Sequence, residues 1–324
     1  MLAYIVRRVL YAIPLLIAVN LITFLLFFSV NSPDDMARAQ LGNKNVKPEM
    51  IERWKREKGY DKPKWFNAKA YGIEKLTDTL FFQKSVKLFL FDFGNADNGR
   101  NIGYDIRVRM WPSLAIALPV LLVGLLVYIT FAMTMAFFRA TYVDFWGVIF
   151  CVVIMSISSM FYIIGGQYLI GKLLHLTPIS GFNPDNMFKF LVLPVIIGIF
   201  SGLGATSRWY RTIFLEDINK DYVRTARAKG LSEGVVLFKH VLGNAMIPIL
   251  TGIVATLPLL FMGSLVTESF FGIPGLGSYV IDGIRAQDFG IVRSMVFLGS
   301  VLYILGLLLT DISYTLVDPR IRFS

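Results

Sequence analysis

The chain has 324 residues, of which 55% are hydrophobic and only 17% are charged. A soluble fold of this size cannot hide so much apolar surface, so the composition excludes a water-soluble globular domain and a disordered chain, and it indicates a membrane protein. The net charge of +10 does not indicate nucleic acid binding, because the lysines and arginines lie between apolar segments and do not alternate with aromatic residues along one face.

The first apolar segment, residues 9–30, is long enough to cross about 30 Å of hydrocarbon at about 1.5 Å per residue. A cleaved signal peptide is the alternative, but the segment exceeds the usual apolar core of such a peptide and has no small-x-small cleavage site before Asn31. We therefore predict a retained span. Arg7 and Arg8 precede it, which predicts a cytoplasmic N-terminus and assigns residues 1–30 to that terminus and the first span.

Residues 31–112 are polar and are predicted to form a large external segment. Pro48 begins a helix that Gly59 ends, and Ile51 and Trp54 lie on one face of this helix. The segment is longer than the loops in which positive charge determines orientation, so its lysines do not contradict an external location. Packing over the external ends of the spans and direct contact with a transported molecule are both open as its role.

Five more apolar segments follow, and each is long enough to span a bilayer. They cover residues 113–138, 145–171, 188–206, 246–268 and 294–313. The predicted fold is therefore an all-α polytopic membrane protein with six transmembrane helices, the last five forming a core over residues 113–313.

The even number of spans returns the C-terminal tail, residues 314–324 with Arg320 and Arg322, to the cytoplasm. Eight other basic residues then lie in inner connections, whereas the two short outer loops hold few, as the positive-inside rule requires. These residues are Arg139, Arg208, Arg211, Lys220, Arg224, Arg227, Lys229 and Lys239. Both termini are therefore predicted to be cytoplasmic.

The inner connection at residues 207–246 contains the sequence DYVRTARAKGL. Its residues Val223, Ala226 and Gly230 occur at i, i+3 and i+7, so a helix there carries one stripe of small side chains that another protein's backbone could approach closely. Gly230 also ends this helix, and Ser232 with the following glutamate can cap the next one. The pattern predicts a short helix, a turn and a second helix.

A second motif, ESFFGIPGLG, begins at Glu268. Gly272, Gly275 and Gly277 surround Pro274, and this composition predicts a tight, irregular external loop. Turn formation and a gating role are both open for the glycines. An ionisable side chain at the end of a span is costly unless it snorkels, pairs or lines a wet cavity, and we expect Glu268 to snorkel toward the interface.

The chain lacks the residues that would let it energise transport alone. The central parts of the six predicted spans contain no Asp, Glu, Lys, Arg or His, one of which a proton-coupled carrier normally needs. The motif G-x-x-x-x-G-K-[ST], which cradles the phosphates of ATP, is also absent from the sequence. If ATP drives transport, ATP and Mg must bind another polypeptide, and no cofactor is expected in this chain.

No catalytic or metal site is predicted. Ser156 and Ser159 lie in a predicted span, but no histidine or lysine lies in another span to activate them. Cys151 is the sole cysteine and the two histidines are far apart in sequence, so neither a disulfide framework nor a metal site has support. The two serines, together with Asn20 and Ser201, are instead candidates for lining a water-filled path.

These motifs resemble those of the membrane subunits, or permeases, of ABC importers of the dipeptide/oligopeptide (peptide/nickel) transport class. The resemblance rests on DYVRTARAKGL, His240 and NAMIP at 244–248, and it extends to residues 48–63, 268–282 and 318–322. The broader importer loop begins with Glu-Ala-Ala before its glycine, whereas this chain has Arg-Thr-Ala there. That departure matches the peptide branch rather than sugar importers.

The resemblance implies a type I ABC importer-like fold whose coupling loop docks on a separate ATPase. The residues it assigns to this coupling are Tyr222, Arg224, Thr225, Ala226, Arg227, Ala228, Lys229, Gly230 and Leu231. Those it assigns to an external loop or gate are Glu268, Phe271, Pro274, Gly275 and Gly277. The implied partners are a second homologous permease subunit, two P-loop ATPase subunits and an extracytoplasmic binding protein, in a bacterial inner membrane.

The function implied by the resemblance is transport and not catalysis. The chain would form half of a translocation path for peptides, which opens to alternate sides of the membrane as the ATPases work. Import of nickel or other metal chelates, or of glutathione, by a subunit of the same class is an alternative. A self-sufficient secondary transporter or channel is an alternative of a different class, and it predicts flux through the isolated chain.

Overall fold

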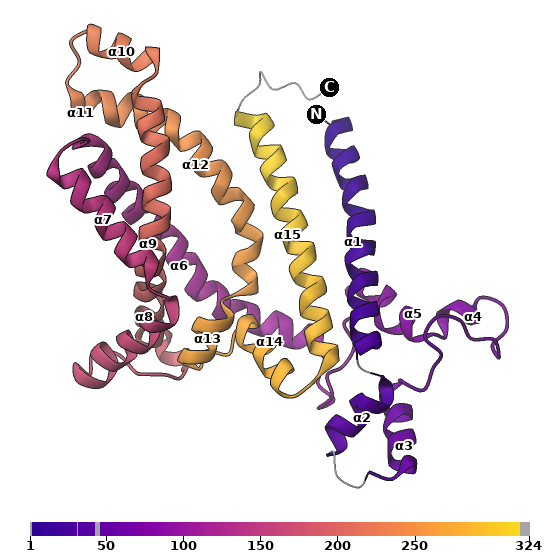
Figure 1. Cartoon of the computed structure of the whole chain (residues 1–324). Coiled ribbons are helices and arrows are strands. Elements are labelled where there is room, and N and C mark those ends of the chain that lie inside the picture. The colour runs from indigo at the N-terminus through magenta and orange to yellow at the C-terminus, as the bar shows by residue number, and fades with distance from the viewer. Residues whose placement is uncertain (1, 31, 43–45, 318–324) are drawn as a thin grey trace.

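The computed structural model describes residues 2–30, 32–42 and 46–317, and these are helical apart from turns and connecting loops (Figure 1). They include an isolated antiparallel bridge between Asn95 and Asn101. The end of the predicted C-terminal tail, with the motif DPRIR, lies outside the described residues.

Long helices are separated along the chain by one or more short ones. The α-helices are α1 (Leu2–Val30), α2 (Pro33–Leu41), α3 (Pro48–Lys58), α4 (Glu74–Thr77), α5 (Leu80–Lys84), α6 (Ile102–Phe137), α7 (Tyr142–Ser156), α8 (Ser159–Gly166), α9 (Met187–Ile218), α10 (Asp221–Ala228), α11 (Glu233–Val235), α12 (Leu242–Thr256), α13 (Leu265–Phe271), α14 (Leu276–Arg285) and α15 (Phe289–Val317). Short 3-10 or π segments adjoin them: η1 (Val86–Leu90), η2 (Gln167–Leu173), η3 (Pro184–Asn186), η4 (Val236–Val241) and η5 (Leu257–Met262).

The predicted spans have counterparts in the structure. Five helical stretches are long and apolar enough to cross a membrane, and a bent pair of helices raises the number to six if the pair is one span. The stretches are Val6–Val30, Ile102–Phe137, Pro184–Ile218, Glu233–Met262 and Phe289–Ser313, and the pair is Tyr142–Ser156 with Ser159–Leu173. The all-α polytopic fold predicted from the sequence is confirmed.

The span predicted over residues 145–171 is broken into two helices in the structure. The chain bends by 86° between α7 and α8. Ile157 has extended backbone angles (φ −95°, ψ 130°), and Ser158 accepts a hydrogen bond at its Oγ from the backbone N–H of Met160 at 3.4 Å. Serine side chains compete for backbone donors in this way and favour helix N-termini, so Ser158 starts a new helix inside a continuous apolar run.

Successive spans place the loops at two opposite ends of the bundle. Figure 1 shows the Leu2 end of α1, the Val317 end of α15 and the short helix α10 at one end, which we call the α10 end. Helices α13 and α14 and the segment that contains α2 to α5 lie at the opposite end, which we call the α14 end (Figure 1). Each span crosses the bundle once, so consecutive connections lie at alternate ends.

Helix α9 is central to the packing because it lies against both α6 and α7. One apolar core joins α6, α9, α10, η4 and α12, and includes Phe214, Val236 and Ile249. Gly204 lets α9 approach α7 closely, since a Cβ there would lie 2.4 Å from the carbonyl oxygen of Cys151. Cys151 is fully buried at this contact.

An ion pair also fixes α7 to α9. The Nε and Nη2 atoms of Arg211 each lie 2.6 Å from a different carboxylate oxygen of Asp144. Such two-pronged pairs are the strongest geometry for a guanidinium and a carboxylate, and both side chains are largely buried here. The pair therefore holds the first turn of α7 against the last third of α9.

The external segment packs over the α14 end of α1. Helix α3 begins at Pro48 and ends before Gly59, whose φ of 68° supplies the left-handed cap, as predicted. Trp54 is buried and stacks on Tyr60 with 5.4 Å between ring centroids. Both rings belong to a cluster that includes Phe28 of α1. The amphipathic face of α3 therefore covers the end of a span.

Candidate functional site

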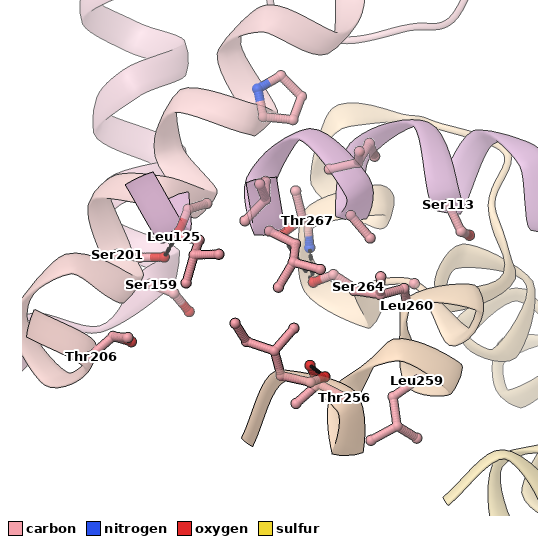
Figure 2. Close-up of a pocket in the computed structure, with 18 of the residues that line it drawn as sticks. Ser113, Leu125, Ser159, Ser201, Thr206, Thr256, Leu259, Leu260, Ser264 and Thr267 are labelled. Atoms are coloured by element: carbon pink, nitrogen blue, oxygen red, sulfur yellow. Dashed lines mark hydrogen bonds between the residues drawn. The ribbon is translucent and has the colours of Figure 1, made fainter. Parts of the chain in front are cut away.

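Helices α6, α8, α9 and α12, together with η5 and α13, surround a cavity of about 780 Å³ (Figure 2). Most of its wall is aliphatic or aromatic, with Tyr128, Trp209 and Tyr210 among the lining residues. Its hydroxyl-bearing lining residues include Ser113, Ser159, Ser201, Thr206, Thr256, Ser264 and Thr267. Figure 2 shows Ser159, Ser201 and Thr206 on one side of the cavity and Thr256, Ser264 and Thr267 across from them.

Helical periodicity explains which positions reach the cavity. Pro194, Gly198 and Ser201 line it from α9, and their spacing of four and then three residues places them on one face. Ser113 and Ala117 line it from α6 with the same spacing of four. This period groups the lining residues of each helix on one face, but it does not by itself show that this face lines a cavity. Hydropathy alone does not find them, because lipid-facing and cavity-facing positions are both mainly apolar.

The four residues predicted to line a path divide into two pairs. Ser159 and Ser201 line the cavity. Ser156 is not among the lining residues, and its exposed hydroxyl donates to the carbonyl of Val152 at 2.6 Å. Asn20 is also absent from the lining: it is buried, and its Nδ2 donates to the carbonyl of Ser85 at 3.0 Å, which ties α1 to the external segment.

Glu268 does not snorkel, so that expectation is wrong. Its side chain is only 1% exposed, at the α14 end of the cavity. Oε1 accepts a hydrogen bond from the N–H of Ser264 at 3.2 Å, and Oε2 accepts one from the N–H of Ser278 at 3.0 Å. Burial raises the pKa of the Glu268 carboxyl, whereas hydrogen bonds from Ser113 and the amides of Ser278, Ser264 and Gly277 oppose that rise.

Gly275 of the motif and Gly263, which precedes the motif, leave room for this carboxylate, and we call the surrounding backbone the cradle. A Cβ on Gly263, where φ is +68°, would lie 1.9 Å from Oε1 of Glu268, and a Cβ on Gly275 would lie 2.2 Å from Oε2. A Cβ on Gly277 would lie 2.5 Å from the carbonyl carbon of Ser264. Real Cβ atoms do not approach other atoms so closely. The tight loop predicted from the glycines is therefore wrapped around a buried acid.

The same loop is anchored to other helices. The N–H of Leu276 donates to Oγ of Ser113 on α6 at 2.8 Å. Phe271 is buried, and its carbonyl accepts a hydrogen bond from Gly181 at 2.7 Å. Pro274 is exposed at the tip of the turn. The predicted gate residues thus gather where α6, α13 and α14 meet at the α14 end of the cavity.

Helix α10 lies at the opposite end and packs on its own chain. Val223 and Ala226 are buried, and they belong to the same apolar core as Val236 and Leu237 of η4. The stripe of small residues was predicted to let another protein approach closely. That orientation is wrong for Val223 and Ala226, which face η4, whereas Gly230 is exposed.

The other face of α10 is exposed. Its exposed side chains include those of Arg224, Thr225, Ala228 and Lys229, and Leu231 in the following turn is 39% exposed. Arg224 makes a single ion pair, at 3.4 Å, with Asp221, which is itself on the surface. Such exposed pairs contribute little. The basic side chains of this face are therefore accessible to a partner.

Arg227 has a different position from the other coupling residues. Its Nε lies 2.7 Å from Oε1 of Glu233 and its Nη2 lies 3.2 Å from Oε2, so the guanidinium joins α10 to the start of α11. Gly230 makes the turn between them with φ +78°, as its predicted role as a helix stop requires. Ser232 occupies the N-cap position of α11 but makes no side-chain capping bond. Glu233 instead holds the turn closed through Arg227.

Comparison with known proteins identifies the family of this chain. The sequence model of the family described as "Binding-protein-dependent transport system inner membrane component" matches residues 128–323, and the model of the N-terminal part of such components matches residues 1–83. The chain is 32% identical over 331 residues to a putative peptide transport system permease protein of Brucella abortus (strain 2308), with all of both chains covered.

Two further relatives are similar over essentially the whole chain. The chain is 27% identical over 340 residues to the oligopeptide transport system permease protein AppB of Bacillus subtilis (strain 168), with 100% of each chain covered. It is 30% identical over 359 residues to the di/tripeptide transport system permease protein DppB of Pseudomonas aeruginosa (strain UCBPP-PA14), with 99% of each covered. The chain therefore belongs to the family of binding-protein-dependent transport system inner membrane components, as a multi-pass permease subunit of a type I ABC importer.

Proposed function

We propose that the chain forms half of the path along which an ABC importer moves peptides, and that a second homologous permease subunit supplies the other half. The cavity of about 780 Å³ carries this proposal. Among the described residues that line it, Glu268 alone has a carboxylate or a basic group, and backbone amides hold that carboxylate. A wall of hydroxyl and apolar groups without a free charge tolerates peptide side chains of either sign.

The printed names of the relatives support peptides over metal chelates or glutathione. They are peptide, oligopeptide and di/tripeptide permeases. A cavity with few fixed polar groups selects weakly, so we assign the main selection of peptides to an extracytoplasmic binding protein at the α14 end.

The exposed face of α10 supports a docking role. We assign Arg224, Thr225, Ala228, Lys229 and Leu231 to contact with one of two P-loop ATPase subunits, which bind the ATP and Mg that this chain does not bind. The α10 end is then cytoplasmic, together with both termini, in a bacterial inner membrane. Arg227 and Gly230 act indirectly, because they shape the turn that presents this face.

Movement of α10 is the step that this chain contributes to the transport cycle. When the two ATPases close around ATP, each displaces the docking helix that rests on it. Because α10 is packed on η4, and η4 continues into α12, the displacement reaches the wall of the cavity. The cavity then opens to the other side of the membrane, as alternating access requires.

Reconstitution in liposomes tests the proposed function. The chain with its second permease, both ATPases and the binding protein should accumulate a labelled oligopeptide against a gradient only when ATP is present. Liposomes that contain this chain alone should accumulate none. Uphill uptake by the isolated chain would instead favour a secondary transporter, and ATP-dependent uptake of a nickel chelate but not of peptides would contradict the substrate class.

A larger side chain in the cavity should slow the transport of long peptides more than that of short ones. In the complete transporter, Ser201→Phe should lower kcat/KM for a pentapeptide by about tenfold, which corresponds to about 1.4 kcal/mol, and should affect a dipeptide less. Ser201 lines the cavity, whereas Ser156 lies outside its lining on an exposed surface, so Ser156→Phe is the matched control. If both variants lose the same fraction of kcat/KM, measured from initial uptake rates, the cavity is not part of the translocation path.

A further inference from the structure

A second, polar cavity of about 210 Å³ lies at the α14 end, between the external segment and the first turns of α15. Its lining contains more basic than acidic side chains. The basic residues are Lys58, Lys62, Lys84, Lys87 and Arg293, and the acidic residues are Asp92 and Asp97. The cavity is separate from the one assigned to transport, and the two share no lining residue.

Arg293 is the most unusual member of this group. It is 5% exposed, and no hydrogen bond or ion pair joins its guanidinium to another residue in the described part of the chain. Its Nε is fully buried and unpartnered. Asp288 acts on this charge only from beyond ion-pair distance. A buried charge without an ion-pair partner is costly, and arginine does not lose its proton in proteins to avoid that cost.

Lys84 is a second, half-buried cation in the same cavity. Its Nζ donates to the carbonyl of Lys58 at 3.0 Å and lies 4.6 Å from the centroid of the Tyr60 ring. No carboxylate forms an ion pair with it among the described residues. Burial lowers the pKa of Lys84 to about 8, and the charge of Arg293 adds to this shift. The two cations therefore repel each other across the cavity.

The nearby carboxylates are already engaged by other donors. Asp97 accepts a hydrogen bond from Gln40, and its Oδ1 lies 3.7 Å from Nζ of Lys58. Asp288, below the cavity, accepts from the N–H of Asp97 at 2.5 Å and from the N–H of Ile291 at 3.1 Å. The exposed Asp92 accepts from the N–H of Gly94 at 3.2 Å. None of these acids forms an ion pair with Lys84 or Arg293.

We propose that this cavity binds an oxyanion of the phosphate class between Lys84 and Arg293. A tetrahedral oxyanion offers several acceptors at once, which suits an arginine and a lysine that converge from different segments. The bound anion would join the external segment to α15 and remove the repulsion between the two cations. This inference concerns the assembly of the external segment and does not depend on which molecule is transported.

The position of the cavity gives two sources for such an anion. Lys64 donates from Nζ to the carbonyl of Phe28 near the end of α1 at 3.0 Å, so the external segment rests at the level where α1 ends and α15 begins. If the spans cross the bilayer as proposed, phospholipid head groups lie at this level. The anion is then the phosphate of a lipid head group or free inorganic phosphate.

Thermal unfolding of the purified full-length chain in a neutral detergent tests the proposal. At pH 7 and matched ionic strength, sodium phosphate should raise Tm by about 2–4 °C over sodium chloride, because a ligand that binds the folded state stabilises it. Arg293→Gln should lose this rise. Lys69→Gln, which removes an exposed lysine outside the cavity, should keep it.

A second arm distinguishes the two sources. In the same neutral detergent and in buffer without phosphate, adding phosphatidylglycerol should raise Tm for the unaltered chain and for Lys69→Gln if a lipid head group is the ligand, and should have no effect if the ligand is free phosphate. Either source supports the site provided that Arg293→Gln abolishes the response. If Arg293→Gln does not fold, Lys84→Gln replaces it.

The proposal is overturned by either of two results. The first is that neither phosphate nor phosphatidylglycerol changes Tm of the unaltered chain. The second is that Arg293→Gln or Lys84→Gln responds as strongly as Lys69→Gln does, because phosphate then acts as a general salt and not at the cavity.

Discussion

Reversing the charges of Arg224 and Lys229 together should lower ATP-driven uptake by the complete transporter by at least about 100-fold, while the chain remains folded and inserted. Both side chains lie on the exposed face of α10, and neither is used in the packing of that helix on η4. An ATPase surface that is complementary to these positive charges would then face negative charges, and like charges across an interface cost several kcal/mol of binding free energy. Co-purification of the ATPases and the initial rate of peptide uptake are the two measurements.

A control with the same chemistry at the other end of the molecule makes this result specific. Lys189, in the first turn of α9, is exposed at the α14 end, and Lys189→Glu should leave ATPase binding unchanged. If the Arg224→Glu and Lys229→Glu double variant binds the ATPases and transports peptides normally, the exposed face of α10 is not the docking surface. Circular dichroism in detergent should show the same helix content for all three proteins.

Replacing Glu268 by alanine should destabilise the chain by about 2–5 kcal/mol. The side chain is 1% exposed, and its removal leaves buried amides around the cradle without an acceptor, at about 1–3 kcal/mol for each group. Glu268→Gln should cost less, because one acceptor oxygen remains. Thermal unfolding in detergent, followed by circular dichroism, measures the order of these variants.

Glycine variants provide the matched test of the same cradle. Gly275→Ala should destabilise the chain, because its Cβ would lie 2.2 Å from Oε2 of Glu268. Gly165→Ala is the control: it lies within a helix, and a Cβ there meets no atom within 4 Å. Its Tm should be unchanged or slightly higher, because alanine favours helix. Equal Tm values for Gly275→Ala and the unaltered chain would show that the cradle is looser than its geometry indicates.

Local sequence signals predicted the local structure well. Pro48 and Gly59 mark the two ends of α3, and Gly230 marks the turn after α10, because proline and glycine restrict or permit backbone angles whatever lies nearby. Hydropathy located the spans for a similar reason, since a span must be long and apolar along its own sequence. The bend before Ser158 escaped this reasoning, because apolar residues continue on both sides of it.

Contacts between distant residues were not predictable in the same way. Glu268 was expected to snorkel because its local sequence does not show the amides that surround it. The hydroxyl that completes the cradle belongs to Ser113, which accepts a hydrogen bond from the amide of Leu276, 163 residues away. Asn20 is likewise only a polar residue in a span as far as the local sequence shows. In the structure its side-chain amide donates to the carbonyl of Ser85, 65 residues further along. The small stripe of α10 had the correct period, but periodicity cannot say which chain covers a face.

The stretch from Glu233 to Met262 gives the molecule a mechanical property. Its 30 residues correspond to roughly 45 Å of helix. At one end, α10 is held against it by the apolar packing of Val223 and Ala226 and by the ion pair of Arg227 with Glu233. Just past its other end, the N–H of Ser264 donates a hydrogen bond to Glu268, and the loop around Glu268 is bonded to α6 and α14. If an ATPase displaces α10 as proposed, we expect this stretch to transmit the displacement to the α14 end of the cavity, because both of its ends are fixed to neighbouring elements.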